Sequence, residues 1–204
     1  MRIIQDPGRI DLSRLRERFA RSGTTADTIY GDQGTRPGAD KLLAASVLIP
    51  IVDRVPEPTI LFTQRTAHLK NHSGQISFPG GRAEARDASA ERTALRETWE
   101  EVGLAAGRIE LLGRLSDYHT RTGYRITPVV GIVQPPFELN PDRNEVAEVF
   151  EVPLAFLLDE RNHQKHSREF EGEERFFFAI PFESRYIWGA TAGILVNLHR
   201  FLMS

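Results

Sequence analysis

The chain has 204 residues, of which 40% are hydrophobic and 26% are charged, and its net charge is −2. These values are typical of one globular domain and exclude a disordered chain, while the near-neutral charge argues against a nucleic-acid partner. The absence of cysteine excludes disulfides, a thiol nucleophile and cysteine-ligated metals. Residues 42–52 form the longest nearly apolar stretch, which is shorter than the roughly 20 residues of a membrane span. Because the N-terminus also lacks the pattern of a signal peptide, we expect a cytoplasmic protein without a membrane partner.

The first predicted element is a short amphipathic helix over residues 12–21, capped by Asp11, in which apolar residues recur at helical spacing. Residues 22–39 follow with many Gly, Thr, Asp and Pro residues and no hydrophobic period, which is typical of a connection. We therefore divide the chain into an N-terminal helix with a flexible connection (1–40) and a second, compact part (41–204).

Apolar runs bounded by proline, glycine or charged residues predict strands in the second part. These strands cover residues 44–52, 59–63, 76–78, 109–115, 124–133, 146–152 and 175–181.

Two further segments have a helical period. The middle helix can be capped by Asp87 and ends at Gly103, and the C-terminal helix contains the apolar positions of residues 194–202 with Thr191 as its cap. No internal repeat is visible. The pattern predicts the α/β (α+β) fold class, with a sandwich around a mixed sheet.

Three carboxylates share one face of the middle helix. A helix turns by 100° per residue, so the side chains of Glu97, Glu100 and Glu101 fall within about 100° of arc. They lie opposite an apolar face that includes Trp99. Like charges at i and i+4 cost a helix roughly 0.2 to 0.5 kcal/mol per pair. A hard divalent cation would relieve this repulsion, although an acidic, solvent-facing helix shows the same periodicity.

A glycine pair, Gly80 and Gly81, follows the strand that precedes this helix. Glycine lets the backbone turn with a positive φ and lets carbonyl oxygens approach an ion. This context favours metal binding over a plain acidic surface.

Residues 81–104 resemble the Nudix box, Gly-x5-Glu-x7-Arg-Glu-aliphatic-x-Glu-Glu-x-Gly-aliphatic, of hydrolases that cleave diphosphates linked to another moiety. The match has three departures. Asp87 stands at the first glutamate position, eight residues separate it from Arg96, and Thr98 takes the first aliphatic position.

Those departures resemble one branch of the superfamily, the coenzyme A diphosphatases. Residues 61–81 are similar to the stretch that these enzymes carry just upstream of the box, with Thr66 in place of the expected Ser or Ala. The resemblance covers most of residues 42–200 and implies a Nudix fold, an α/β/α sandwich around a mixed sheet.

The resemblance also implies roles for individual residues. Glu97 and Glu101 would be the principal metal ligands, Glu100 an accessory ligand, and the carbonyl of Gly80 a further oxygen donor to Mg²⁺ or Mn²⁺. Arg96 would orient the glutamates by charge-assisted hydrogen bonds.

The general base could be Glu97 in the box or Glu145 or Glu148 outside it, and the sequence does not choose between them. A solvent-facing acidic edge is the simpler interpretation of Glu145, Glu148 and Glu151. Asp87 is interpreted first as the helix cap. The residues expected to bind the substrate are Arg65, Lys70, His72 and Gly81.

The implied function is metal-dependent hydrolysis of the diphosphate bond of coenzyme A or acyl-CoA, giving 4′-phosphopantetheine or its acyl form and adenosine 3′,5′-bisphosphate. One alternative is a Nudix hydrolase of another nucleoside diphosphate derivative, such as ADP-ribose, a dinucleoside polyphosphate or an oxidised nucleotide. Another is a non-catalytic Nudix module that senses a nucleotide. We expect a small-molecule substrate as the partner, and a homodimer stays open.

Overall fold

The structure, a computed structural model, describes residues 4–6, 9–22, 29–30, 42–67, 74–170 and 172–204. In chain order the elements are β1 (Ile4–Asp6), β2 (Arg9–Ile10), α1 (Leu12–Ser22), β3 (Ile29–Tyr30), β4 (Leu43–Val52), β5 (Thr59–Arg65), β6 (Ile76–Ser77), β7 (Gly80–Arg82), α3 (Ala90–Val102), β8 (Ile109–Arg114), β9 (Tyr118–His119), β10 (Tyr124–Val133), β11 (Val146–Pro153), α4 (Leu154–Leu157), β12 (Gln164–Phe170), β13 (Glu173–Phe182), β14 (Arg185–Trp188) and α5 (Ala190–Met203).

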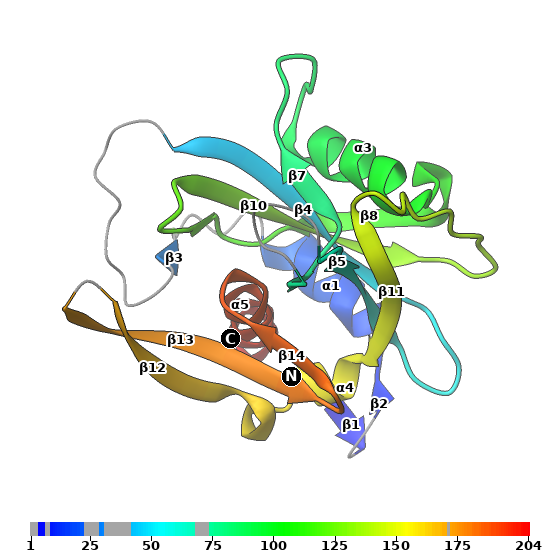
Figure 1. Cartoon of the computed structure of the whole chain (residues 1–204). Coiled ribbons are helices and arrows are strands. Elements are labelled where there is room, and N and C mark those ends of the chain that lie inside the picture. The colour runs from blue at the N-terminus through cyan, green and yellow to red at the C-terminus, as the bar shows by residue number, and fades with distance from the viewer. Residues whose placement is uncertain (1–3, 7–8, 23–28, 31–41, 68–73, 171) are drawn as a thin grey trace.

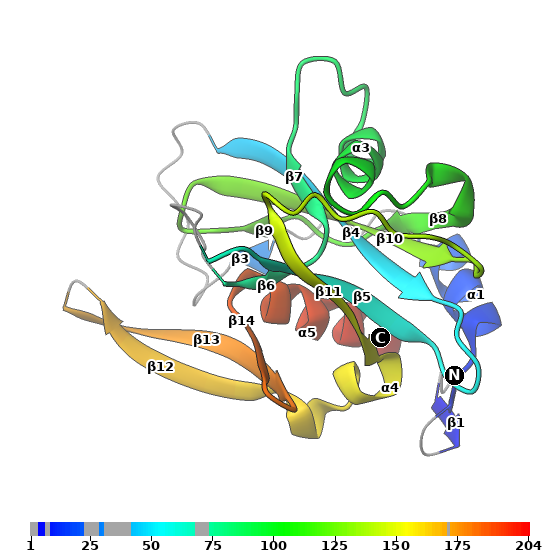
Figure 2. The same ribbon diagram turned by 45° about the vertical axis from the view of Figure 1, so that its right-hand side comes forward.

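The main sheet has the strand order β11-β5-β4-β10-β9-β3, with β6 beside β5, β7 beside β4 and β8 beside β10. It is mixed, because β4 pairs in parallel with β10 and antiparallel with β5 and β7. Helix α3 covers one face of this sheet, and α5 covers the other (Figure 1). Figure 2 shows α5 between the main sheet and a second sheet made of β12, β13 and β14. The predicted sandwich around a mixed sheet is confirmed.

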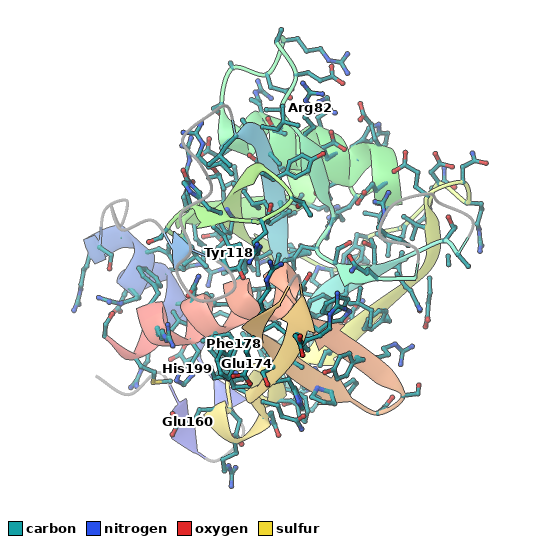
Figure 3. The ribbon with its side chains drawn as sticks, turned by 60° about the vertical axis from the view of Figure 1, so that its left-hand side comes forward. Arg82, Tyr118, Glu160, Glu174, Phe178 and His199 are labelled. Atoms are coloured by element: carbon teal, nitrogen blue, oxygen red, sulfur yellow. The ribbon has the colours of Figure 1, made fainter. Side chains whose placement is uncertain are left out.

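Strand β4 separates two apolar layers, as the near-continuous apolar run of a strand buried on both faces predicts. Ile49 and Ile51 lie in the large core on the α5 side, whereas Leu48 and Val52 pack on the α3 side. In Figure 3, Arg82 of β7 is labelled near α3 and Phe178 of β13 near α5.

Helix α1 belongs to the α5-side core, although it precedes residue 41. Its Asp11 cap is confirmed, since the Ser13 amide donates to Asp11 Oδ1 at 2.8 Å. Leu15 is fully buried, and the ring of Phe19 lies 4.6 Å from that of Phe201. The predicted connection lies mostly outside the described residues, and the division of the chain at residue 40 stays a prediction.

All the predicted strands are present, and the predicted bounds of β10 are those observed. The sequence did not predict the short strands β1, β2, β3, β7, β9 and β14, the longer strand β12 or the single turn α4. Strand β7 is a glycine strand that pairing with β4 holds in place, with Gly80 opposite Val47 and Gly81 opposite Ser46.

Two predicted helix caps are wrong. Helix α3 is capped by Ser89, whose side chain accepts from the Arg92 amide, because Asp87 is engaged elsewhere. Helix α5 begins after Gly189 without a side-chain cap, and the Thr191 hydroxyl instead donates to the carbonyl of Ile76 at 3.0 Å.

The predicted apolar face of α3 is also wrong for Trp99, which is 58% exposed. The helix packs on β4 and β7 through small side chains, including the fully buried Ala94 and Thr98. A face built from small residues allows close approach to the sheet, which a bulky indole would prevent. Among the described residues, no helix combines the length and apolar character needed to cross a membrane.

Candidate active site

The three glutamates of α3 lie at different depths. The side chain of Glu100 is 48% exposed, that of Glu97 is 18% exposed and that of Glu101 is 7% exposed. They therefore form a graded row from solvent down to the sheet.

Glu101 lies against the end of β5 and the start of β7. The amide of Gly80 donates to Glu101 Oε2 at 3.2 Å, and Arg65 Nη1 lies 3.8 Å from Oε1. Burial raises the pKa of Glu101 to about 8, and the charges of Glu145 and Glu97 push it in the same direction. Arg65 and the Gly80 amide only partly offset this effect.

Glu97 lies beside Gly81. Burial raises the pKa of Glu97, with further contributions from the charges of Glu100 and Glu145 and with Arg96 opposing them. A Cβ placed on Gly81 would overlap the Glu97 carboxylate in its present position, so a side chain there would require the carboxylate to move. The absence of a side chain at this position thus has a direct steric reason.

Arg96 connects two of the glutamates to the turn before the helix. It donates to Glu97 Oε1 at 2.8 Å, to Glu100 Oε2 at 2.9 Å and to the carbonyl of Arg82 at 3.1 Å. The same guanidinium makes two bonds to Asp87, from Nε to Oδ1 at 3.1 Å and from Nη2 to Oδ2 at 2.8 Å. The predicted orienting contacts of Arg96 with Glu97 and Glu100 are thus present.

Asp87 therefore supports Arg96 and does not cap the helix. The hydroxyl of Thr93 and the amide of Glu84 also donate to Asp87, which fixes the carboxylate in place. Hydrogen bonds from Arg96 hold the pKa of Asp87 well below its usual range, and the Glu84 amide acts in the same direction. Nothing in the local sequence distinguishes this role from capping, because both need an aspartate near the helix start.

Of the two candidate bases outside the box, the structure places Glu145 near α3. The charge of Glu145 raises the pKa of both Glu97 and Glu101. Glu148 faces the other side of the sheet, where it pairs with Arg185. A register shift between Val146 and Glu148 separates the two glutamates. Glu97 and Glu145 thus lie on the α3 side and Glu148 does not, and the identity of the base stays a prediction.

Glu151, on β11, is paired with groups outside the row of glutamates. Arg54 binds its carboxylate through two nitrogens, and the hydroxyl of Thr59 donates to it at 2.5 Å. Although burial acts against them, these hydrogen bonds leave the pKa of Glu151 below its usual value. Glu151 is thus held in a structural ion pair.

The structure describes two of the four residues that were predicted to bind the substrate, Arg65 and Gly81. Lys70 and His72 lie outside the described residues. Arg65 lies beside Glu101, and its Nε is buried without a hydrogen-bond partner among the residues that the structure describes. Gly81 adjoins Glu97, as shown above. The substrate-binding roles of all four residues stay predictions.

Arg86 is a further partner of the row of glutamates that the sequence did not indicate. Arg86 bridges Glu84 and Glu100, with nitrogen to oxygen distances of 2.7 and 3.5 Å. Both Arg86 and Glu84 lie in the turn between β7 and α3, whose conformation no periodicity could indicate.

A hollow of about 560 Å³ adjoins Glu97 and is otherwise lined by residues 82–85 of the turn. In the part of the chain that the structure describes, no three His, Cys, Asp or Glu side chains are arranged as a ready metal site. The donor set is nevertheless made of carboxylate and carbonyl oxygens, which hard cations such as Mg²⁺ and Mn²⁺ prefer. Gly81 has no side chain beside the Glu97 carboxylate, which also fits the binding of such a cation. The metal-ligand roles of Glu97, Glu100, Glu101 and Gly80 stay predictions.

Comparison with known proteins decides the family. The NUDIX domain profile matches residues 42–171, and the uncharacterized Nudix hydrolase NudL of Escherichia coli K12 is 42% identical over 154 residues, which is 76% of this chain and 80% of that relative. The chain belongs to the Nudix family. It is therefore a phosphoanhydride hydrolase of a nucleoside diphosphate derivative, of a kind that generally requires a divalent metal ion.

Solved structures of the same family are also similar to this Nudix hydrolase. The Mycobacterium smegmatis Nudix hydrolase RenU is 20% identical with a TM-score of 0.48, over 64% of this chain and 81% of that one. The NUDIX domain of Shewanella oneidensis NrtR, solved with ADP ribose, is 23% identical with a TM-score of 0.45, over 61% of this chain and 82% of that one.

Proposed function

We propose that this Nudix hydrolase cleaves the diphosphate bond of coenzyme A or acyl-CoA. The products would be 4′-phosphopantetheine or its acyl form and adenosine 3′,5′-bisphosphate. One observation carries the proposal. The stretch at residues 61–81, which resembles that of coenzyme A diphosphatases, contributes both groups that contact the deepest carboxylate, since Arg65 and the Gly80 amide lie against Glu101.

In this proposal Glu97 and Glu101 hold Mg²⁺ or Mn²⁺, with Glu100 and the Gly80 carbonyl as further oxygen donors. The bound cation would neutralise charge on the diphosphate and lower the pKa of a water. Arg96, fixed by Asp87, holds the Glu97 and Glu100 carboxylates in place. Glu97 or Glu145 accepts the proton of the attacking water, and both side chains lie where their charges interact.

The test is to incubate the purified chain with coenzyme A and Mg²⁺ and to identify the products by mass spectrometry. The expected result is adenosine 3′,5′-bisphosphate and 4′-phosphopantetheine, with a lower kcat/KM for 3′-dephospho-coenzyme A. Consumption of ADP-ribose or a dinucleoside polyphosphate without turnover of coenzyme A would overturn the substrate assignment and leave the family unchanged. Nucleotide binding without any hydrolysis would support a sensing module.

We further propose that the protein acts in the cytoplasm on a small-molecule substrate. Whether it forms a homodimer is answered by light scattering coupled to size-exclusion chromatography.

A further inference from the structure

A second hollow, of about 440 Å³, lies on the face of the main sheet away from α3. Its walls come from the ends of β5, β6 and β11 and from residues 184–188, and the lining residues include Gln64, Ile76, Glu148, Arg185, Tyr186 and Trp188. We call it the β14 groove. Its volume falls in the range of roughly 300 to 1,000 Å³ that is typical of small-molecule sites.

The register of β13 and β14 shows that one wall of the groove is a free strand edge. The Gly189 amide donates to the Phe178 carbonyl at 3.1 Å, in the same register as the strand pairs. Hydrogen-bonded pairs alternate along an antiparallel ladder, so Ile180 and Ile187 exchange both bonds. Tyr186 and Trp188 then direct their amides and carbonyls away from β13, toward the outer edge of the sheet.

Two observations agree with this assignment. Tyr186 lies opposite Pro181, which has no amide to donate, so this pair loses nothing by not exchanging hydrogen bonds. Among the described residues, no backbone hydrogen bond outside the strand ladder involves Tyr186 or Trp188. The groove is therefore bordered by main-chain donors and acceptors of Tyr186 and Trp188 that no described strand pairs with.

The groove has no uncompensated charge among its lining residues. Its two ionised side chains, Glu148 and Arg185, bind each other, and Arg185 also lies 4.2 Å from the centre of the Phe150 ring. A phosphate group would therefore find no free cation there. A neutral, polar chain suits this lining better, since Gln64 adds an amide to the groups of the strand edge.

The groove lies at the same end of β5 as the row of glutamates. Gln64 and Arg65 are consecutive on β5, so their side chains point to opposite faces of the sheet. Gln64 lines the groove, whereas Arg65 contacts Glu101 on the α3 side, and the Arg65 amide is bonded to the Gln75 carbonyl at 2.9 Å. Only the strand end separates the two places.

We propose that the β14 groove binds the pantetheine arm of the substrate, an uncharged chain with two secondary amides, by pairing those amides with the edge of β14. The assignment deepens the proposed function, because it holds for catalysis only if the protein acts on coenzyme A. Addition of an extended chain to a free strand edge is a general mode of recognition, in which main-chain hydrogen bonds provide the affinity.

The test uses the full chain and pantetheine, which has the arm but no phosphate, in a calorimetric titration. Tyr186→Pro removes one edge amide that the ladder does not use, and Gln64→Met removes the side-chain amide at similar volume. Each change should weaken pantetheine binding about three- to tenfold, the effect of one lost hydrogen bond. In turnover of coenzyme A, KM should rise by a similar factor while kcat stays unchanged.

The matched control is Ser167→Pro on β12, the other outer edge of the same sheet. Arg168 pairs with Arg175 and His166 with Phe177, so in the alternating ladder Ser167 directs its amide outward. Pantetheine binding by this variant should equal that of the wild type. Circular dichroism identifies any variant that fails to fold, and Gln64→Met then decides alone.

The outcomes separate the groove from the catalytic function. Pantetheine binding that depends on Tyr186 and Gln64, without hydrolysis of coenzyme A, would support the groove and refute the proposed function. Hydrolysis of coenzyme A with KM unchanged in both variants would refute the groove alone. Preferential binding of adenosine or of trialanine in place of pantetheine would also overturn the assignment.

Discussion

The two faces of the main sheet are built from different chemistry. On one face α5 buries ten of its 14 residues, and its apolar side chains join α1, α4 and the second sheet in one large core. Tyr118 packs so closely on α5 that a Cβ on Gly193 would overlap its ring, in the region labelled in Figure 3. On the other face α3 buries small side chains and one carboxylate, Glu101. The α5 face thus stabilises the domain, whereas the α3 face arranges charge.

Burying a carboxylate on the α3 face is energetically unfavourable. The pKa of Glu101 is raised to about 8 because burial disfavours the ionised carboxylate. Within the described residues the α5 face has no comparable buried carboxylate. Carboxylates with shifted pKa values are common at functional sites. The stability lost by burying them is offset by a well-packed core elsewhere in the fold.

The largest expected effect is on turnover, from Glu101→Gln. The change keeps the size of the side chain and an acceptor for the Gly80 amide but removes the charge that would bind the cation. We expect kcat to fall by at least about a hundredfold, as when a group that stabilises the transition state is lost. Thermal unfolding of the metal-free protein should show no loss of stability, because burial already disfavours the ionised form of Glu101.

Glu17→Gln on α1 is the matched control, because this glutamate is 52% exposed and its helix packs in the core on the α5 side of the sheet. It should leave both kcat and the melting temperature unchanged. Wild-type turnover in Glu101→Gln would remove α3 from the catalytic account.

The next effect concerns the residue that holds Arg96. Asp87→Asn weakens both bonds to the guanidinium, so Arg96 is less well fixed against Glu97 and Glu100. Loss of such a supporting partner lowers activity or metal affinity about 10- to 100-fold. Steady-state kinetics at several Mn²⁺ concentrations measure both quantities. Asp87→Glu, the residue of the Nudix box, should retain more activity than Asp87→Asn, and equal activities would contradict the supporting role.

On the α5 face the expected effect is on stability alone. Leu15→Ala removes a fully buried side chain from the core and should lower the free energy of unfolding by about 2 to 5 kcal/mol. The folded variant should keep its kcat. Urea unfolding measures the loss, with the exposed Trp99→Ala on α3 as a comparison that should cost less than about 1 kcal/mol. A larger loss for Trp99→Ala than for Leu15→Ala would reverse the assignment of the two faces.

The smallest expected effect is a pH dependence at the edge of the α3 face. Hydrogen bonds from Arg114 lower the pKa of Glu91 from 4.5 to about 2. Because the folded pKa lies below the unfolded one, the pair stabilises the fold fully above pH 4.5 and loses this contribution as the pH falls toward 2. Both side chains are partly exposed, so we expect about 1 kcal/mol or less at pH 7.

Urea unfolding of Glu91→Gln and wild type at pH 7 and at pH 3 measures this effect. The difference in free energy should shrink at the lower pH. A difference independent of pH would show that the ion pair contributes nothing and that the substitution acts through packing.

The sequence predicted the strands that consist of long apolar runs, such as β4 and β10, because burial on both faces leaves a continuous signal. It did not predict β7, since a strand of Gly80, Gly81 and Arg82 has no propensity of its own and exists through pairing with β4. Strand β14 was missed because its four residues alternate too briefly to show a period.

At the site, helical spacing placed the three glutamates on one face but could not give their depths, which depend on the sheet below. Trp99 was assigned to the core because the helical period depends only on where apolar residues occur. It does not show that α3 packs on the sheet through small side chains. Glu145 and Glu148 could not be separated, because Glu145 precedes β11 and its position depends on the segment before the strand, which periodicity does not describe. The position of Asp87 in the sequence suggests a helix cap, and only the folded structure shows that it pairs with Arg96.

The most direct test of the central claim, that α3 binds a catalytic divalent cation, is a calorimetric titration of the metal-free protein with Mn²⁺. The wild type should show a saturable site, and Glu97→Gln and Glu101→Gln should each weaken or abolish it while both variants stay folded. Equal Mn²⁺ binding by the wild type and both variants would contradict the account.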